Sequence, residues 1–351
     1  MGDPEITIAG RKIGVAHPPY VICEISANHN GDLERAIKSI EAAAQTGADA
    51  IKLQTYTADT LTIDSDRDDF RVSGGLWDGR TLYDLYSEAQ TPFEWHEALF
   101  RCARDLGVTL FSTPFDDSAV QLLADLEAPA YKIASFEIVD LPLIRRVARE
   151  GRPMIISTGM ANLAEMQDAV ATAREAGCGE IAMLHCVSSY PAPAADSNIA
   201  TIPHLADAFD VVSGLSDHTH GTAVAAASVA IGGAIVEKHF TLSRADGGPD
   251  SAFSLEPDEF RRLVDDCRSA WAARGRVHYD LKGSEQGSIV FRRSLYVVKD
   301  IEVGEALSSD NVRSIRPGHG LAPKHYDTVI GQRARRALRR GEPLKWDAIT
   351  R

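Results

Sequence analysis

The amino-acid sequence predicts an α/β protein in which a (β/α)₈ TIM barrel is followed by a small β-rich domain. Short runs rich in β-branched residues recur eight times, and segments with apolar residues at helical spacing lie between them. Glycine follows several of these segments, where a helix would end: Gly47, Gly107, Gly151 and Gly177. Eight strand–helix units close most naturally into a barrel, because each helix returns the chain to a parallel neighbouring strand.

We expect the eight strands of the barrel at residues 21–26, 50–56, 108–115, 130–137, 153–160, 180–190, 211–219 and 235–242. The clearest helical patterns cover residues 33–46, 119–126, 141–150 and 164–176. An open, doubly wound sheet is the alternative fold. It is disfavoured because no GxGxxG turn follows the first strand.

The connection after the second strand is unusually long, from Thr57 to about Gln90. Loops of this length in a compact domain commonly act as lids or binding loops. This one carries amphipathic groups suited to covering a sugar, namely Trp77, Asp78, Arg80, Tyr83 and Tyr86. The plainer alternative is a surface excursion that packs its own aromatic side chains. After it, Thr91-Pro92-Phe93-Glu94 predicts a helix that begins with a capping box and proline at its first position.

The C-terminal segment differs from the barrel in pattern and in charge. The helical pattern stops near residues 283–287, and a motif at 303–307 returns at 340–344 as a weak repeat, each copy expected to form a strand, a tight turn and a strand. The predicted domains are a barrel at 1–282, a linker at 283–290 and a β-rich domain at 291–351. Residues 286–351 carry 13 Lys and Arg against 7 Asp and Glu, and the rest carries 24 against 43. This contrast suggests that the two parts dock within or between subunits, unless it is ordinary surface composition.

Composition excludes several classes of protein. The chain has no run of about 18 uncharged apolar residues, so we expect no membrane span. Its first residues are acidic and lack the apolar stretch of a secretory signal. Five scattered cysteines form no disulfide framework and suggest a reducing, cytoplasmic setting. A net charge of −13 argues against a general nucleic-acid binder.

Polar side chains gather at the C-terminal ends of the predicted strands, where barrels of this kind carry their active sites. A barrel interior favours Val, Ile and Leu, and charged side chains there are costly unless they are paired. One or two buried Lys–Glu pairs could be structural, but three lysines with several carboxylates and hydroxyls at one end indicate a functional site. The side chains at these ends are Glu24, Ser26, Asn28, Lys52, Gln54, Thr55, Ser112, Thr113, Lys132, Ser135, Glu137, Ser157, Thr158, His185, Ser188, Ser189, Tyr190, Ser216, Asp217, His218, Glu237, Lys238 and His239.

Two groups within this ring point to different chemistry. His218 and His239 end adjacent strands, so their imidazoles can share one divalent metal ion, with His220 as a competing ligand. Lysine and hydroxyl side chains near helix N-termini suit a phosphate or a carboxylate. The candidates for this anion pocket are Lys132, Ser135, Ser157, Thr158, Ser188, Ser189 and Ser216. Alternatively, Lys52 or Lys132 is a Schiff-base lysine, which would make the protein an aldolase.

Ordered motifs run across nearly the whole chain: EISANHNG, AIKLQTY, FSTPFD, YKIASFE, ISTGM, GLSDHT, EKHFT and GGPDSAFSLEP. Together they resemble the sialic-acid synthase family, and the tail with SIRPGHG is similar to that family's antifreeze-like (SAF) domain. LWDGRTLYDLYSEAQTPFEWH and SAFSLEP resemble the pseudaminic acid synthase branch. Ser188 stands where the N-acetylneuraminate branch has an asparagine that contacts the substrate, and this departure fits a different sugar.

The resemblance implies a transferase that condenses phosphoenolpyruvate with an open-chain N-acetylated amino-sugar aldehyde and releases phosphate. It implies a divalent metal cofactor, Mn²⁺, Mg²⁺ or Co²⁺. The expected sugar is 2,4-diacetamido-2,4,6-trideoxy-L-altrose, with N-acetylneuraminate and legionaminate synthesis as alternatives. A Schiff-base aldolase and a non-catalytic sugar- or ice-binding protein are more distant alternatives. The resemblance also implies a domain-swapped homodimer in which Arg316 reaches into the neighbouring subunit's barrel.

The resemblance and the strand-end pattern together predict a role for each site residue. The predicted metal ligands are His218 and His239. The predicted catalytic side chains are Glu24, Lys52, Glu137 and Asp250. The predicted phosphoenolpyruvate contacts are Lys52, Thr113, Lys132, Ser135, Ser157, Ser188 and Ser216. The predicted sugar contacts are Glu24, Gln54, Tyr56, Trp77, Tyr83, Phe136, Tyr190 and Arg316.

Overall fold

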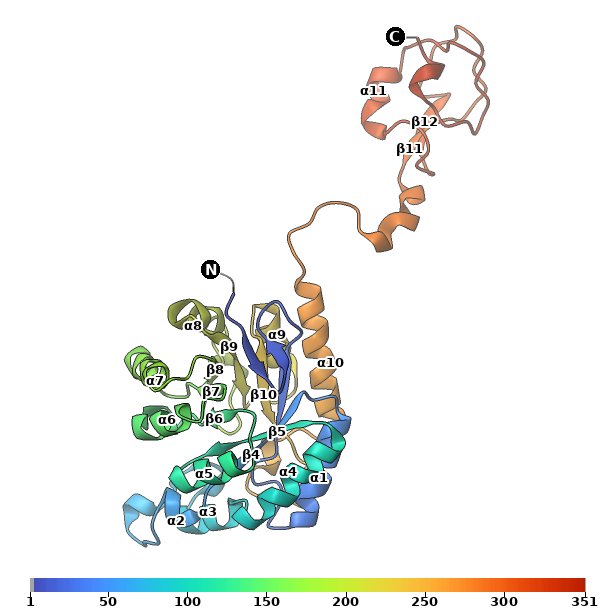
Figure 1. Ribbon diagram of the computed structural model, residues 1–351. Coiled ribbons are helices and arrows are strands. Elements are labelled where there is room, and N and C mark those ends of the chain that lie inside the picture. Colours follow the sequence, from blue (N-terminus) through green and yellow to red (C-terminus); the bar gives the residue numbers. More distant parts are fainter. Residues whose placement is uncertain (1–2, 351) are drawn as a thin grey trace. The chain divides into compact units, whose positions relative to one another are not determined.

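The computed structural model describes residues 3–350, which form two compact units. The first unit ends at Gly275 and contains a barrel, and the second begins at Arg276 (Figure 1). This division lies a few residues before the predicted linker, and residues of that linker form a 3-10 helix, η8 (Gly283–Phe291). No helix in the described part of the chain is long and apolar enough to cross a membrane.

Eight parallel strands close into a barrel in the first unit, in the order β10-β3-β4-β5-β6-β7-β8-β9 (Figure 1). The closure confirms the predicted (β/α)₈ fold and contradicts the open doubly wound sheet. Every predicted strand is present, and each is shorter than expected, because the chain leaves the barrel soon after its polar strand end. The strands are β3 (Tyr20–Glu24), β4 (Ala50–Thr55), β5 (Thr109–Pro114), β6 (Tyr131–Ile133), β7 (Met154–Ser157), β8 (Ile181–Cys186), β9 (Val212–Asp217) and β10 (Ile235–His239).

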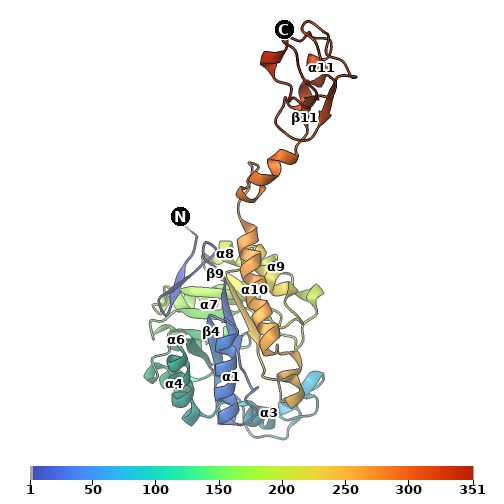
Figure 2. The same ribbon diagram turned by 90° about the vertical axis from the view of Figure 1, so that its right-hand side faces the viewer.

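A ring of helices covers the outside of the barrel, and Figure 2 shows α1 and α10 side by side on one flank. Helix starts are set by local capping: Asp32 accepts from the Glu34 amide, and Asn162 forms a capping box with Glu165. The helices of the ring are α1 (Leu33–Gln45), α4 (His96–Leu106), α5 (Asp117–Asp125), α6 (Leu141–Ala148), α7 (Leu163–Glu175), α8 (Thr201–Phe209), α9 (Ala223–Ala230) and α10 (Pro257–Arg274).

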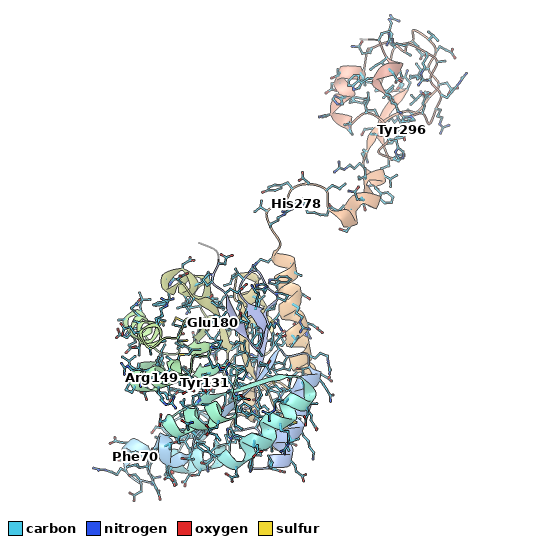
Figure 3. All side chains as sticks on the ribbon, in the orientation of Figure 1. Phe70, Tyr131, Arg149, Glu180, His278 and Tyr296 are labelled. Atoms are coloured by element: carbon cyan, nitrogen blue, oxygen red, sulfur yellow. The ribbon has the colours of Figure 1, made fainter. Side chains whose placement is uncertain are left out.

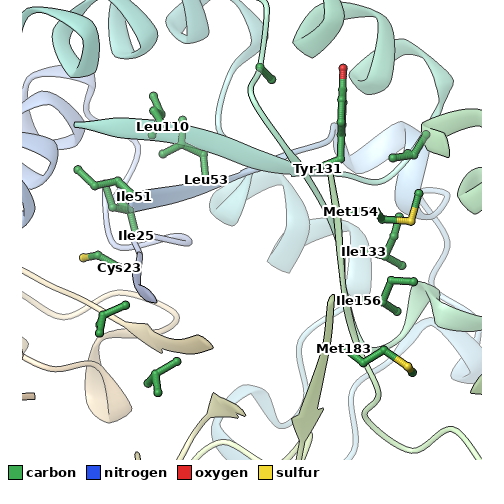
Figure 4. Close-up of a cluster of buried hydrophobic side chains, with 14 of the residues drawn as sticks. Cys23, Ile25, Ile51, Leu53, Leu110, Tyr131, Ile133, Met154, Ile156 and Met183 are labelled. Atoms are coloured by element: carbon green, nitrogen blue, oxygen red, sulfur yellow. The ribbon is translucent and has the colours of Figure 1, made fainter. Parts of the chain in front are cut away.

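The side chains of each strand alternate between two cores. On β6, Tyr131 and Ile133 join the core between strands and helices (Figure 4), so Lys132 between them points into the barrel. A second apolar cluster fills the N-terminal end of the barrel, and it includes isoleucines of the hairpin formed by β1 (Ile6–Ile8) and β2 (Arg11–Ile13). The sequence did not predict this hairpin, because its strands are too short for a period-2 pattern. Apolar packing therefore closes one end of the barrel and leaves the other end for polar groups.

The long connection after β4 is partly helical. It contains α2 (Ala58–Leu61), η1 (Asp68–Phe70), η2 (Gly75–Trp77) and α3 (Leu82–Ala89). Phe70, labelled in Figure 3, lies at the same end of the barrel as α2 and α3. The predicted capping box at Thr91 is wrong, because the hydroxyl of Thr91 contacts Nε2 of His29 at 3.3 Å instead. The chain passes through η3 (Phe93–Trp95), which has no side-chain cap, before α4 begins.

The second unit has its own small apolar core, which includes Leu307 and Leu344. Regular strands are few there, β11 (Ser294–Val297) and β12 (Val312–Ile315), together with η9 (Pro323–His325), α11 (Tyr326–Val329) and η10 (Trp346–Ala348). The predicted repeat is present as a repeated turn instead of a repeated pair of full strands. In each copy a glutamate side chain accepts from the backbone amide three residues before it, Glu305 from 302 and Glu342 from 339. Each turn then delivers its leucine to the core.

Candidate active site

A cavity of about 430 Å³ opens at the C-terminal ends of the barrel strands. Each of the eight strands, or the loop that follows it, contributes to the lining. The segment between α2 and α3 and the loop around Asp250 complete the wall. Of the predicted site residues, the cavity brings together Glu24, Lys52, Gln54, Tyr56, Trp77, Lys132, Ser135, Phe136, Glu137, Ser157, Ser188, Tyr190, Ser216, His218, His239 and Asp250.

A buried network of opposite charges forms the floor of the cavity. Lys52 on β4 pairs with Glu24 on β3, and its Nζ lies 3.7 Å from Oε1 of Glu237 on β10. Burial raises the pKa of Glu24 to about 7, although Lys52 opposes the shift. Burial alone would lower the pKa of Lys52, but Glu237 and Glu24 hold it above its ordinary value. Lys52 is therefore a fixed positive charge beside a carboxyl group that titrates near neutrality.

Hydroxyl groups and a second lysine form a cradle next to this network. Nζ of Lys132 donates to Oγ of Ser157 at 2.7 Å, and the hydroxyls of Ser135 and Ser188 lie 2.8 Å apart. Gly159 makes the cradle possible, because a Cβ there would lie 2.5 Å from Cβ of Ser135. Burial lowers the pKa of Lys132, so an incoming anion would strengthen its charged form. The arrangement suits a small, highly charged anion such as a phosphate or a carboxylate.

The two histidines at the ends of β9 and β10 lie with their ring centroids 5.4 Å apart. Nδ1 of His218 donates to the carbonyl of Val187 at 2.9 Å, which leaves Nε2 as the nitrogen with a free lone pair. Nδ1 of His239 is buried without a hydrogen-bond partner among the described residues. Burial holds the pKa of His239 well below its ordinary value, so the ring is neutral, as a metal ligand must be.

These features fit the predicted metal site at His218 and His239. In the described part of the chain, no three His, Cys, Asp or Glu side chains gather as a metal-binding group. A metal ion held there would take its remaining ligands from water or substrate oxygens, which is the arrangement of a catalytic site with open positions.

Further carboxyl and aromatic groups surround this centre. Oδ2 of Asp250 accepts a hydrogen bond from the Ser26 hydroxyl, and burial raises the pKa of Asp250. Burial raises the pKa of Glu137 to about 7, opposed by Lys132. The ring centroid of Tyr190 lies 4.3 Å from that of His218 and 6.2 Å from that of His239. Against the effect of burial, the pKa of His218 is raised by the side chain of Cys186 and the carbonyl of Val187. The site thus combines two carboxyl groups that titrate near pH 7 with an anion cradle and a pair of histidines, of which His239 is held neutral.

Comparison with known proteins identifies the family. The profile of the NeuB family matches residues 39–279, and that of the SAF domain matches residues 292–350. The chain belongs to the NeuB family. This result confirms the predicted resemblance to sialic-acid synthases and to their C-terminal domain.

Several relatives of this NeuB-family chain carry names that describe their activity. A pseudaminic acid synthase of Helicobacter pylori is 43% identical over 95% of this chain and 98% of the relative. One of Campylobacter jejuni is 44% identical over 93% of this chain and 95% of the relative. Among solved structures, a sialic acid synthetase of Leptospira borgpetersenii in complex with citrate is 30% identical, with a TM-score of 0.73 over 82% of this chain and 95% of that one.

Several predicted residues of this NeuB-family chain lie outside the cavity lining, including two candidates for the anion pocket, Thr158 and Ser189. Thr113 supports Lys52 from behind, since its hydroxyl accepts from Nζ at 3.1 Å. Tyr83 is on another face of α3, and its hydroxyl donates to Asp59 at 3.1 Å. Its side chain therefore does not face the cavity. His220 is exposed, which leaves His218 and His239 as the pair. Arg316 is an exposed residue of the second unit, directly after β12.

Some residues that line the cavity were given no role by the sequence. Glu237 on β10 was named among the polar strand ends but assigned no task, and Cys186 on β8 was not considered. Both occupy inward positions that follow from the period-2 alternation of their strands. The remaining residues that the sequence did not indicate are apolar, so no polar signal marks them: Leu61, Val72, Leu82, Leu85, Ala89, Phe115, Ala134 and Pro249.

Proposed function

We propose that this protein is a pseudaminic acid synthase that condenses phosphoenolpyruvate with 2,4-diacetamido-2,4,6-trideoxy-L-altrose and releases phosphate. The observation that supports the reaction most strongly is the anion cradle of Lys132 and the serines, set directly beside two buried carboxyl groups and a pair of histidines. The choice of sugar rests on the names of the relatives that are 43–44% identical over nearly the whole chain.

Phosphoenolpyruvate carries its phosphate and its carboxylate on the same carbon atom, carbon 2. Lys52 and Lys132 supply two positive charges at the floor of the cavity, and both are almost fully buried. Hydroxyl groups of Ser135, Ser157 and Ser188 can donate to the remaining oxygens. A buried lysine attracts an anionic ligand more strongly than an exposed lysine does, because little solvent screens the two charges from each other.

The nitrogen atoms of His218 and His239 would hold the divalent cation, Mn²⁺, Mg²⁺ or Co²⁺. Bound there, the cation would supply Lewis acidity that polarises the carbonyl group of the sugar aldehyde. Histidine binds a metal ion through a neutral ring, so the binding of the cation would displace any proton from His218.

The chain's own residues direct the rest of the reaction. Carbon 3 of phosphoenolpyruvate forms a bond to the aldehyde carbon, and the positive charge that develops at carbon 2 lies near Glu24 and Glu137. The aldehyde oxygen takes up a proton as its π bond breaks and becomes a hydroxyl group. The two carboxylates stabilise the charge at carbon 2 and accept the proton released by the water that adds there, so protons gained and lost balance. The tetrahedral carbon then expels phosphate by cleavage of its C–O bond. Groups that titrate near pH 7 suit this task, since they exchange protons readily at neutral pH.

The test is to supply phosphoenolpyruvate and a divalent cation with each candidate sugar in turn, and to measure phosphate release and product mass. We expect sugar-dependent release with the diacetamido sugar and weaker or no release with N-acetylmannosamine or the legionaminate precursor. A Schiff-base aldolase would instead be trapped by borohydride in the presence of substrate and would tolerate EDTA. Trapping at Lys52 or Lys132 would overturn the proposed reaction.

We further propose that the protein is a domain-swapped homodimer in which Arg316 of one chain completes the site of the other. The opposite net charges of the two predicted domains support docking between them. Arg316→Ala and His239→Ala, each inactive alone, should recover activity when the two variants are refolded together. In the mixed dimer, one of the two sites combines a barrel that keeps His239 with Arg316 from the other chain. Absence of recovery, in a sample shown to contain the mixed dimer, would contradict the proposal.

A further inference from the structure

The segment after β4 presents only apolar and aromatic side chains to the cavity. Its lining residues are Leu61, Val72, Trp77, Leu82, Leu85, Tyr86 and Ala89. The same segment contains 11 charged residues between positions 58 and 89, and none of them is in the lining. A segment so rich in charge turns no charged side chain toward the cavity, and its surface there is apolar and aromatic, whereas the strand ends present charges and hydroxyls.

Helix α3 shows how this separation arises. Leu82, Leu85, Tyr86 and Ala89 recur at the spacing of one helical face, and all four line the cavity. Such a face normally packs against a protein core. Here Leu82 is only half-buried, and the face opposite carries Ser87 and other exposed polar groups. Exposed apolar surfaces commonly mark binding sites, so a ligand that covers this face would explain why it is turned toward the cavity.

The apolar residues are held in place from behind. Tyr86 and Leu61 pack on a small cluster that includes Tyr56 and Ala89. Trp77 donates from its indole nitrogen to the carbonyl of Pro249 at 3.0 Å, which ties the segment to the loop of Asp250. The surface is therefore preorganised by the protein, as a selective binding site requires.

We propose that an apolar wall on one side of the cavity recognises the methyl groups of the sugar and discriminates against sugars that carry a hydroxyl group at carbon 6. This apolar wall consists of Leu61, Val72, Leu82, Leu85 and Phe115. This inference rests on the proposed function. The aldehyde carbon must lie beside Lys52 and the histidines, so the opposite end of the open chain, with carbon 6, extends away from the strand ends toward the wall. The proposed sugar has a methyl group at carbon 6 and two acetyl methyl groups, which an apolar surface accepts without loss of hydrogen bonds.

A hydroxyl group at carbon 6 would lose its water at the apolar wall and find no partner among the five side chains. Apolar pockets discriminate against an added hydroxyl by roughly 100-fold. We therefore expect kcat/KM for the 6-deoxy sugar to exceed that for its 6-hydroxy counterpart by about 100-fold. Leu82→Asn should reduce this ratio by about tenfold or more, since a polar side chain then faces carbon 6.

The experiment compares the two sugars, which differ only at carbon 6, in the wild type, Leu82→Asn and Leu82→Met. Ser87→Asn is the matched control, because it places the same side chain on the exposed face of the same helix. Leu82→Met keeps the wall apolar and should keep the preference. Phosphoenolpyruvate binding, measured by calorimetry without sugar, should be the same in all four proteins, which shows that the floor of the cavity is intact.

The outcomes separate this inference from the function on which it rests. A wild type that uses neither sugar would overturn the proposed function together with the inference. A wild type that uses both sugars equally well, or a Leu82→Asn variant that keeps the full preference for the 6-deoxy sugar, would overturn the apolar wall alone. A preference lost in Leu82→Asn and kept in Leu82→Met and Ser87→Asn supports it.

Discussion

Replacement of Lys238 by methionine is expected to destabilise the barrel by about 3–5 kcal/mol. Nζ of Lys238 lies 2.7 Å from Oδ2 of Asp217 and also donates to the carbonyl of Thr219, and both charged side chains are only 1% exposed. Methionine keeps most of the volume of lysine but leaves the carboxylate of Asp217 buried without its counter-charge. Removal of one partner from a fully buried pair has that cost, because the remaining charge keeps its desolvation penalty and loses its attraction.

Urea unfolding followed by circular dichroism measures this loss. The matched control is Arg261→Met, since Arg261 and Asp258 form an exposed pair whose side chains are 48% and 95% accessible. Exposed pairs contribute about 0–1 kcal/mol, so the control should lose no more than that. The double variant Asp217→Leu/Lys238→Met should lose less than the two single variants summed. If Lys238→Met were as stable as Arg261→Met, the role assigned to the buried pair would be wrong.

The pair also bears on the site, because each partner directly precedes one of the two histidines. Asp217 ties the end of β9 to Lys238 on β10, and His218 and His239 follow them. Loss of the pair should therefore weaken the binding of Mn²⁺, measured by calorimetry on the folded variant.

Three further predictions concern the cavity. Burial raises the pKa of Glu137 to about 7 from an ordinary 4.5, so the folded protein keeps a proton that the unfolded chain has lost. This group's contribution to stability is full below pH 4.5 and is lost as the pH rises through 7. The stability of the wild type relative to Glu137→Gln should fall between pH 5 and pH 8 in urea unfolding, and a pH-independent difference would contradict the shift. EDTA treatment, or His239→Ala, should abolish phosphate release while circular dichroism stays unchanged, and full activity in the variant would remove His239 from the metal site. Lys132→Met should weaken phosphoenolpyruvate binding by at least tenfold in calorimetry without sugar, whereas unchanged affinity would exclude Lys132 from the anion cradle.

The barrel and its polar strand ends could be predicted because both have strong signals in the sequence. Charged residues at inward positions, such as Lys52 and Lys132, stand out where a barrel interior should be apolar. The apolar half of the cavity could not be predicted in the same way. The spacing of Leu82, Leu85 and Ala89 is that of any amphipathic helix, and only the tertiary structure shows that this face meets a cavity. Tyr83 was assigned to the sugar for its residue type, but it lies one position off that face.

The most direct test of the account is the reaction itself, with purified protein, phosphoenolpyruvate, a divalent cation and 2,4-diacetamido-2,4,6-trideoxy-L-altrose. Phosphate release and the mass of the product are measured together. We expect one phosphate for each new nine-carbon acid, formed only when the sugar and the cation are both present. Phosphate release without a coupled product, or a product formed in the presence of excess EDTA, would contradict it.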